Sequence, residues 1–127
     1  MGTFTRDNTD LAVDLDGLGQ QHRAEDGGMI IALERWHAGL DTAEMFADLP
    51  DGACQEPHWG YILKGQVTMR YTDGTAESLS AGQAYYIRPG HNAHIVEDAE
   101  FVEFTLADPT PGINTVELEP SRQPETV

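Results

Sequence analysis

The sequence has one cysteine, few basic residues and no long apolar run. With Cys54 alone, an intramolecular disulfide is impossible, which excludes a small secreted fold held together by bridges. Asp and Glu number 22 against 7 Lys and Arg, and the formal net charge of −15 argues against binding to nucleic acid or anionic membranes. No apolar stretch approaches the roughly 18 residues of a membrane span, and no signal-peptide pattern opens the chain. We therefore expect a soluble, cytoplasmic protein.

Common catalytic signatures are absent as well. The chain contains no G-x-S-x-G, no phosphate-binding G-x-x-x-x-G-K-[ST], no C-x-x-C pair and no H-E-x-x-H. A closed structural zinc site built from several cysteines cannot form with one cysteine. No helical pattern is long enough for a β-α-β unit, and there is no internal repeat. The remaining patterns are those of β-strands.

Short strand patterns separated by glycine turns fill the middle of the chain. β-branched and aromatic residues predict a strand over 29–37, and residues 67–71 alternate apolar with polar as in a half-buried strand. Asp73-Gly74 predicts a hairpin with a type I′ turn. Further strands are expected over 59–63, 75–79, 84–87, 94–97 and 101–106, with a tight turn at 64–65 and a break at 98–99. Such spacing is typical of an all-β sandwich or barrel with antiparallel strands.

The strand patterns also divide the chain into three parts. The expected barrel spans residues 29–107. Residues 1–28 are polar and glycine-rich, and we expect a flexible or loosely packed segment whose few apolar residues cover the core as a strand or a helical turn. Residues 108–127 are polar and contain proline, and we expect them to form a C-terminal extension.

Candidate metal ligands form two clusters. Cys54, Glu56 and His58 fall within five residues, while His91 and His94 lie beside a Pro-Gly turn further on. Residues 54, 56 and 58 share one face of an extended strand, but about 13 Å would separate Cys54 from His58, too far for one ion. The intervening proline favours a bend or bulge that brings the two together. A buried apolar role for Cys54, a barrel-core role for His58 and a solvated Glu56 remain as alternatives.

The first cluster resembles the first of the two cupin motifs, G(x)5HxH(x)3-4E(x)6G. Gly65 matches its closing glycine, which puts His58 at the position of the family's glutamate. Cys54 then stands at the position of the second motif histidine. The run from Glu56, with the letters EPHWGY, together with the later PGH, resembles a group of small single-domain bacterial cupins.

The second cluster resembles the other cupin motif, G(x)5PxG(x)2H(x)3N. Gly82 opens it and Gly90 takes the inner glycine position, but the expected histidine falls on Ala93. Because residues 91 and 93 share a strand face, His91 is the preferred ligand. His94 replaces it if a bulge shifts the register by one residue.

The resemblance implies an antiparallel double-sheet jelly-roll barrel with a metal site inside. Cys54, His58 and His91 would hold a divalent transition metal, and Glu56 would act as a general base or a fourth ligand. A thiolate with imidazoles suits Zn²⁺ best, with iron, nickel, manganese or copper as alternatives. The implied function is that of an oxygenase, isomerase or lyase acting on a small organic molecule. A non-catalytic ligand- or metal-binding module, serving as a sensor or accessory protein, is the alternative, and a metal-free structural cupin is a third possibility.

The outer surface of the expected barrel predicts a partner. If His58 faces inward, alternation turns Trp59, Tyr61 and Leu63 outward, and three large apolar side chains need a cover. The N-terminal segment or a second subunit can supply it, and we expect a homodimer.

An arginine at the mouth of a barrel can hold a substrate carboxylate bidentately. Candidate pocket-lining residues are Met69, Tyr71, Tyr86 and Arg88.

Overall fold

Seven antiparallel β-strands and one short 3₁₀ turn make up residues 2–108, the part of the chain that the computed structural model describes. This confirms the all-β, antiparallel prediction. The predicted C-terminal extension lies outside the described residues, apart from Asp108. The elements are β1 (Asp10–Leu15), β2 (Gly19–Asp26), β3 (Met29–Trp36), η1 (Pro50–Gly52), β4 (His58–Tyr71), β5 (Ala76–Ser80), β6 (Ala84–Ile87) and β7 (His91–Leu106).

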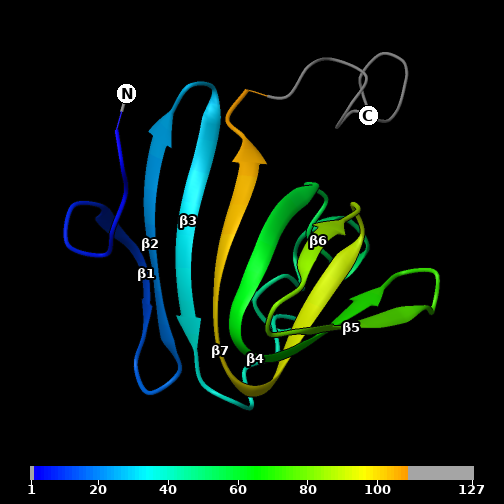
Figure 1. Cartoon of the computed structure of the whole chain (residues 1–127). Coiled ribbons are helices and arrows are strands. Elements are labelled where there is room, and N and C mark those ends of the chain that lie inside the picture. Colours follow the sequence, from blue (N-terminus) through cyan, green and yellow to red (C-terminus); the bar gives the residue numbers. More distant parts are fainter. Residues whose placement is uncertain (1, 109–127) are drawn as a thin grey trace.

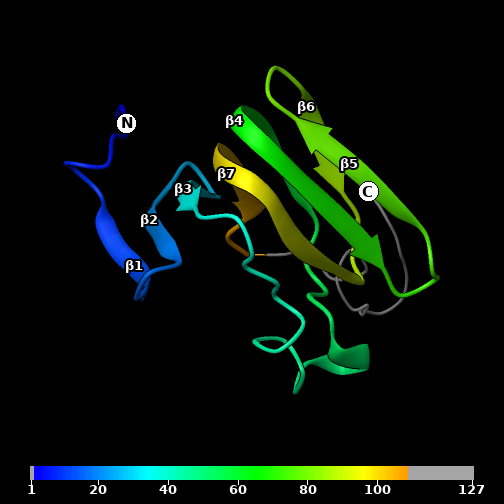
Figure 2. The same cartoon turned by 90° about the horizontal axis from the view of Figure 1, so that it is seen from below.

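All seven strands belong to one strongly curved sheet. Its order is β1-β2-β3-β7-β4-β5, and β6 pairs with the first part of β4, whereas β5 pairs with the second part. The long strands β4 and β7 run side by side and bend together, so the sheet curls into an open cup (Figures 1 and 2). The hydrophobic core fills this cup, with side chains from β3 packed against those from β5 and β6.

The bends of β4 and β7 replace two interruptions that we expected. The chain does not turn at residues 64–65, and β7 continues through residues 98–99. Gly65 has a φ of 85°, and a Cβ at this position would lie 2.1 Å from the carbonyl oxygen of Asp98. The register of the β4–β7 ladder shifts around Gly65. The prediction of a tight turn was therefore wrong, because the glycine lets the paired strands β4 and β7 bend together in close contact rather than end.

The hairpin between β4 and β5 forms at Asp73-Gly74, as predicted, but not with a type I′ turn. The amide of Gly74 donates to the carbonyl of Tyr71 over 3.0 Å, and the amide of Tyr71 donates to the carbonyl of Thr75 over 2.8 Å. Gly74 has a positive φ, and Asp73 does not. A type I′ turn needs positive φ at both central residues, so the three-residue loop here is a type I turn followed by a left-handed glycine.

Two strands occupy the N-terminal segment that we expected to be loosely packed. β2 pairs with β3 over its whole length, from Gly19 opposite Trp36 to Asp26 opposite Met29, and β1 pairs with β2. Val13 and Leu15 of β1 pack against the core. Most polar residues from Asp10 to Asp26 therefore belong to strands, and Gln21 and Arg23 of β2 line the cavity. No helix among the described residues is long and apolar enough to cross a membrane.

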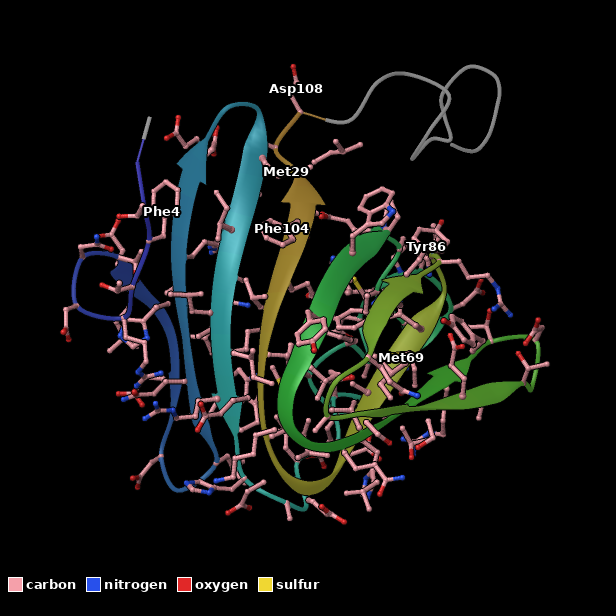
Figure 3. The ribbon with its side chains drawn as sticks, in the orientation of Figure 1. Phe4, Met29, Met69, Tyr86, Phe104 and Asp108 are labelled. Carbon is pink, nitrogen blue, oxygen red and sulfur yellow. The ribbon has the colours of Figure 1, made fainter. Side chains whose placement is uncertain are left out.

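Alternation along the strands separates the inside of the cup from its outside. Val67, Met69 and Tyr71 of β4 are buried, which confirms the predicted half-buried strand. On β6, Tyr85 is buried, while Tyr86 is exposed. Figure 3 shows Met69 within the barrel and Tyr86 at its outer surface. The same alternation decides which polar side chains reach the interior.

Candidate metal centre

Three potential metal ligands meet where the connection before β4 crosses the start of β7. His58 and His91 are the first residues of β4 and β7, and Cys54 lies in the connection that follows η1. The amide of Cys54 donates to the carbonyl of His91 over 2.9 Å, and the amide of Gly90 donates to the carbonyl of Cys54 over 2.8 Å. This short bridge fixes the connection alongside β7 and brings Cys54 next to both histidines.

The spacing of the three side chains fits a single ion. Their ligand atoms lie within 4.8 Å of one another, and the Sγ of Cys54 is 3.6 Å from the Nε2 of His58. The rings of His58 and His91 meet edge to face, with centroids 5.0 Å apart. Tetrahedral zinc, with Zn–S near ~2.3 Å and Zn–N near ~2.0 Å, would place sulfur and nitrogen about 3.5 Å apart. The Cys54–His58 pair already has this separation.

Hydrogen bonds on the far side of each ring orient the two imidazoles. The Nδ1 of His91 is 2.8 Å from the carbonyl oxygen of Arg88, which can only accept, so this nitrogen carries the proton. The Nδ1 of His58 is 2.7 Å from the hydroxyl of Thr105. The Nε2 of His91 is therefore available as a ligand, and the Thr105 contact leaves the Nε2 of His58 available when Nδ1 carries the proton. A hydrogen bond at the far nitrogen is the usual way that a protein orients a histidine ligand. The donor set fits a tetrahedral transition metal with one open position.

Burial sets the protonation of the three groups in the absence of a cation. It lowers the pKa of His58 and of His91 to about 4, so both rings are neutral at pH 7 and can ligate. Burial also raises the pKa of the Cys54 thiol to about 11. A metal ion binds the thiolate, so binding would release this proton.

The cluster lies in the wall of a cavity of about 340 Å³. This volume lies within the range of small-molecule sites, about 300–1,000 Å³. Most of the lining is apolar, which excludes water and strengthens electrostatic interactions inside. The apolar lining residues include Leu40, Phe46, Ile62, Val67, Met69, Ile87, Ile95 and Phe101.

Solved structures with low sequence identity share this architecture. No family model and no curated protein matches the sequence. KdgF from Halomonas sp. superposes with a TM-score of 0.63 at 17% identity, covering 85% of this chain and 96% of that one. An RmlC-like cupin from Shewanella frigidimarina NCIMB 400 gives a TM-score of 0.59 at 12% identity, with 83% and 89% covered. The fold is that of the cupins.

The cupin jelly roll confirms the predicted fold class. The oxalate decarboxylase OxdC of Bacillus subtilis also matches, with a TM-score of 0.59 at 17% identity over 84% of this chain. The chain spans 30% of the length of that decarboxylase. At identities this low the similarity concerns the fold, so the chemistry of this protein has to be argued from its own side chains.

Beside Cys54, His58 and His91, the barrel holds two carboxylates that the sequence analysis missed. The Nε1 of Trp36 donates to Glu34 and the hydroxyl of Tyr85 donates to Glu103, each over 2.8 Å. The Oε2 of Glu103 lies 3.7 Å from the Nδ1 of His58. Burial raises the pKa of both carboxyl groups, and the charge of Glu103 raises that of Glu34 further. The two carboxyls thus form a coupled acidic pair beside the cluster.

Strand parity was the available signal for these carboxylates. Glu34 shares the inner face of β3 with Ala32 and Trp36, both buried. The last strand gave no such signal, because its apolar residues occur on both faces around Glu103. Gly60 makes room for the pair, since a Cβ there would lie 2.4 Å from the hydroxyl of Tyr85.

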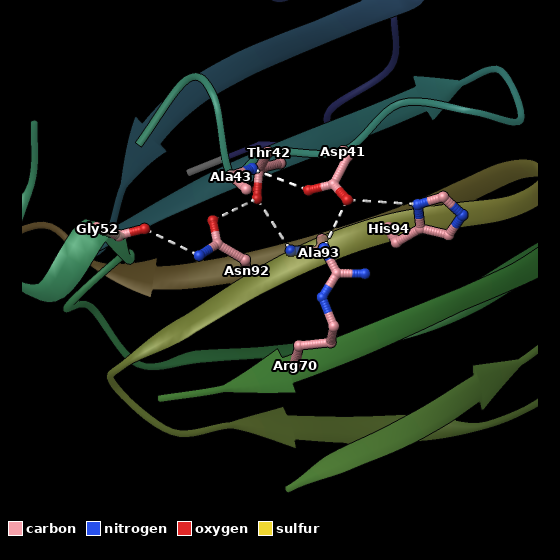
Figure 4. A network of polar contacts seen from close by, with 8 residues as sticks. All are labelled: Asp41, Thr42, Ala43, Gly52, Arg70, Asn92, Ala93 and His94. Atoms are coloured by element: carbon pink, nitrogen blue, oxygen red, sulfur yellow. Dashed lines mark hydrogen bonds and ion pairs between the residues drawn. The ribbon is translucent and has the colours of Figure 1, made fainter. Parts of the chain in front are cut away.

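The two other predicted site residues lie outside the cluster of three. Glu56 is exposed and lines the cavity, but it does not join the group of ligand atoms. The Nδ1 of His94 faces Asp41, 3.6 Å from its carboxylate, and Arg70 binds the same carboxylate (Figure 4). Alternation along β7 explains why His91, and not His94, joins Cys54 and His58. His91 lies on the inner face of the strand, as the sequence analysis preferred, and His94 does not.

Of the four residues expected to line the pocket, one does. Met69 lines the cavity. Tyr85 takes the place expected for Tyr86, because the inner face of β6 carries residues 85 and 87. The guanidinium of Arg88 stacks 3.7 Å above the ring of Tyr71 and pairs with a hairpin aspartate, so Arg88 belongs to the surface beside the hairpin. Tyr71 is buried in the core beneath it and does not line the cavity.

Proposed function

We propose that this cupin binds one divalent transition metal through Cys54, His58 and His91 and acts on a small organic molecule in the adjoining cavity. The observation that carries the proposal is the meeting of three ligand atoms within 4.8 Å in the wall of an apolar cavity. Each histidine is also oriented by a hydrogen bond at its Nδ1. A purely structural histidine pair would not need a thiol sulfur 3.6 Å from the Nε2 of His58.

Zinc is the metal that this donor set favours. A thiolate and two imidazoles are typical of Zn²⁺, whereas manganese prefers oxygen ligands. One of the matching oxalate decarboxylase structures is described as containing Mn(II) centres. Because no carboxylate belongs to the cluster of three here, we place zinc ahead of manganese, iron and nickel.

When bound, the ion would supply a Lewis acid that polarises an oxygen atom of the substrate, or a site for O₂. The first role is favoured, because the usual oxygenase centre combines two histidines with a carboxylate, and neither Glu56 nor Glu103 joins the cluster. An isomerase or lyase is therefore the preferred class. The apolar walls exclude water, while Thr105 and the Arg88 carbonyl hold the two rings in position.

A binding module without catalysis is the second candidate. The carboxylates nearest the cluster, Glu34 and Glu103, already accept hydrogen bonds from Trp36 and Tyr85. A general base has to reach the proton that it removes, and these two groups face other side chains. Such a cavity would hold a ligand or a metal without transforming it.

Metal analysis of protein purified without a histidine tag tests the proposal. We expect about one ion per chain, recovered by zinc after chelation. A content below about a tenth of an ion that neither Zn²⁺ nor Fe²⁺ restores would contradict it. If metal is present, dependence of any turnover on O₂ separates an oxygenase from an isomerase or lyase.

A further inference from the structure

Arg23 is the single arginine or lysine among the described residues that line the cavity. It belongs to β2 and is exposed, so it lies at the mouth rather than in the interior. The protein carries a formal charge of −15, and its surface should repel small anions. A cation at the entrance of the cavity therefore changes which molecules can enter.

Most other described arginines are engaged. Arg35 pairs with Glu100 at 3.4 Å, and Arg88 and Arg70 each bind an aspartate. Arg6 donates to the side chain of Gln20 over 3.0 Å. For Arg23, neither a carboxylate nor a hydrogen-bond partner of the guanidinium occurs within residues 2–108.

The nearby carboxylate of Glu34 on β3 has partners other than Arg23. Glu34 accepts a hydrogen bond from Trp36 and interacts with the side chain of Gln21, the inward-facing residue two places before Arg23. A surface arginine in so acidic a chain would be expected to find a carboxylate. Arg23 instead keeps its donors free at the rim of the cavity.

The strand register separates Arg23 from His58 by three strand spacings along the sheet. Arg23 pairs with Ala32 of β3, Ala32 with Glu103 of β7, and Glu103 with Gly60 of β4, two residues after His58. Three strand spacings of about 4.8 Å put β2 about 14 Å from β4 along the sheet, and its curvature shortens the direct path. The side chains at both ends line the same cavity, which leaves room between them for a molecule of a few carbon atoms.

We propose that the ligand of this cavity carries a carboxylate, which Arg23 binds at the end opposite Cys54, His58 and His91. The guanidinium presents two parallel N–H groups that match the two oxygens of a carboxylate. The other end of the ligand then faces the metal cluster. The inference rests on the proposed function for the role of that second end, but the Arg23 contact needs no metal.

Titration calorimetry with defined probes tests this inference. The probes are propionate, succinate and glutarate, each compared with its uncharged amide. At least one carboxylate should bind the natural protein, and its amide should bind at least about tenfold more weakly. Arg23→Gln should weaken the carboxylate about ten- to hundredfold, and Arg23→Lys should retain part of the affinity. Arg6→Gln, which removes an arginine outside the cavity, should change nothing.

Three results would overturn the inference: equal carboxylate affinity in Arg23→Gln, equal affinity for acid and amide, or no binding of any carboxylate. Circular dichroism of each variant checks that the fold is intact. The titrations are run on metal-loaded and on chelated protein. If only the proposed metal function is wrong, the carboxylate still binds chelated protein, and its affinity still depends on Arg23. If Arg23→Gln contains a full complement of metal and binds the carboxylate as tightly as the natural protein, only the carboxylate inference is wrong.

Discussion

The Sγ of Cys54 lies 3.6 Å from the Nε2 of His58, although four residues of extended strand would separate them by about 13 Å. Residues 54–57 are not part of β4, and the buried Pro57 immediately precedes its first residue. Cys54 instead pairs with the start of β7 through the carbonyl of His91. A bend at a proline thus brings together donors from two distant parts of the chain.

Removing any one of these donors should abolish stoichiometric metal binding. Cys54→Ala, His58→Ala and His91→Ala each leave two ligands, which hold zinc far more weakly than three. We expect less than about a tenth of an ion per chain after gel filtration. His94→Ala is the matched control, since that histidine faces Asp41, and it should retain the metal. Equal loss in His94→Ala would contradict the assignment.

Spacing and parity in the sequence predicted that Cys54, His58 and His91 would lie together, as they do in the structure. The glycines at 65 and 82 fixed the register of the two clusters, and alternation chose His91 over His94. Pro57 indicated the bend that brings Cys54 to His58. The pairing of Cys54 with β7 was not predictable, because it depends on where the curved sheet places the connection.

The acidic pair and the full length of β4 and β7 were not predictable from the sequence, because both depend on contacts between distant parts of the chain. Glu34 and Glu103 become neighbours only when β3 pairs with β7, and no local pattern sets that register. The sequence around Gly65 predicts a turn, yet in the structure Gly65 lies where the paired strands β4 and β7 come into close backbone contact. At these positions the structure is set by contacts between strands distant in the sequence and not by the local preference for a turn or a strand.

Thr105→Val should weaken metal binding without removing a ligand. The hydroxyl of Thr105 lies 2.7 Å from the Nδ1 of His58 and orients that ring, and valine keeps the shape of the side chain. Loss of such an orienting contact typically costs about 10- to 100-fold in metal affinity. Competition with a chromogenic chelator measures the dissociation constant. Thr68→Val on β4 is the control and should bind zinc as the natural protein does; equal affinities in both variants would show that Thr105 does not orient the ligand.

Glu34→Gln should flatten the pH dependence of stability in metal-free protein. Burial raises the pKa of Glu34 above its usual 4.5, so above that pH the folded state binds more protons than the unfolded state. Its contribution to stability is therefore complete below pH 4.5 and is lost as the pH rises. Glutamine can still accept the hydrogen bond from Trp36, so the variant should be about 1–3 kcal/mol more stable than the natural protein at pH 8.

Urea unfolding between pH 5 and 8 measures this difference. Exposed Glu25 on β2 provides the control, and Glu25→Gln should follow the natural protein at every pH. A constant offset between Glu34→Gln and the natural protein across the range would contradict the raised pKa.

Gly65→Ala should destabilise the fold far more than Gly82→Ala. Both glycines have a φ near 90°, so both substitutions incur the same backbone strain of about 1–2 kcal/mol. At Gly82 nothing lies within 4 Å of an added Cβ, whereas at Gly65 the carbonyl of Asp98 would lie 2.1 Å away. We expect Gly65→Ala to cost about 3 kcal/mol more than Gly82→Ala in thermal or urea unfolding. Similar losses of unfolding free energy in the two variants would mean that the backbones of β4 and β7 are not in close contact at Gly65.

The outer face of β4 should be covered by a second copy of the chain. The exposed fractions of Trp59, Tyr61 and Leu63 are 37%, 42% and 60%, and β1 and β2 extend the sheet instead of covering these side chains. Such a row of large apolar groups is typical of an interface. Sedimentation equilibrium should therefore give twice the chain mass of 13.9 kDa.

Leu63→Lys places a charge at the most exposed residue of this row and should shift the protein to monomer with an unchanged circular dichroism spectrum. Leu11→Lys changes another exposed leucine, on β1 at the far edge of the sheet, and should leave the dimer intact. A natural protein that sediments as a monomer, or a dimer that survives Leu63→Lys, would contradict this interface. In the second case the partner must dock on another face, because a buried lysine without a carboxylate partner destabilises an interface.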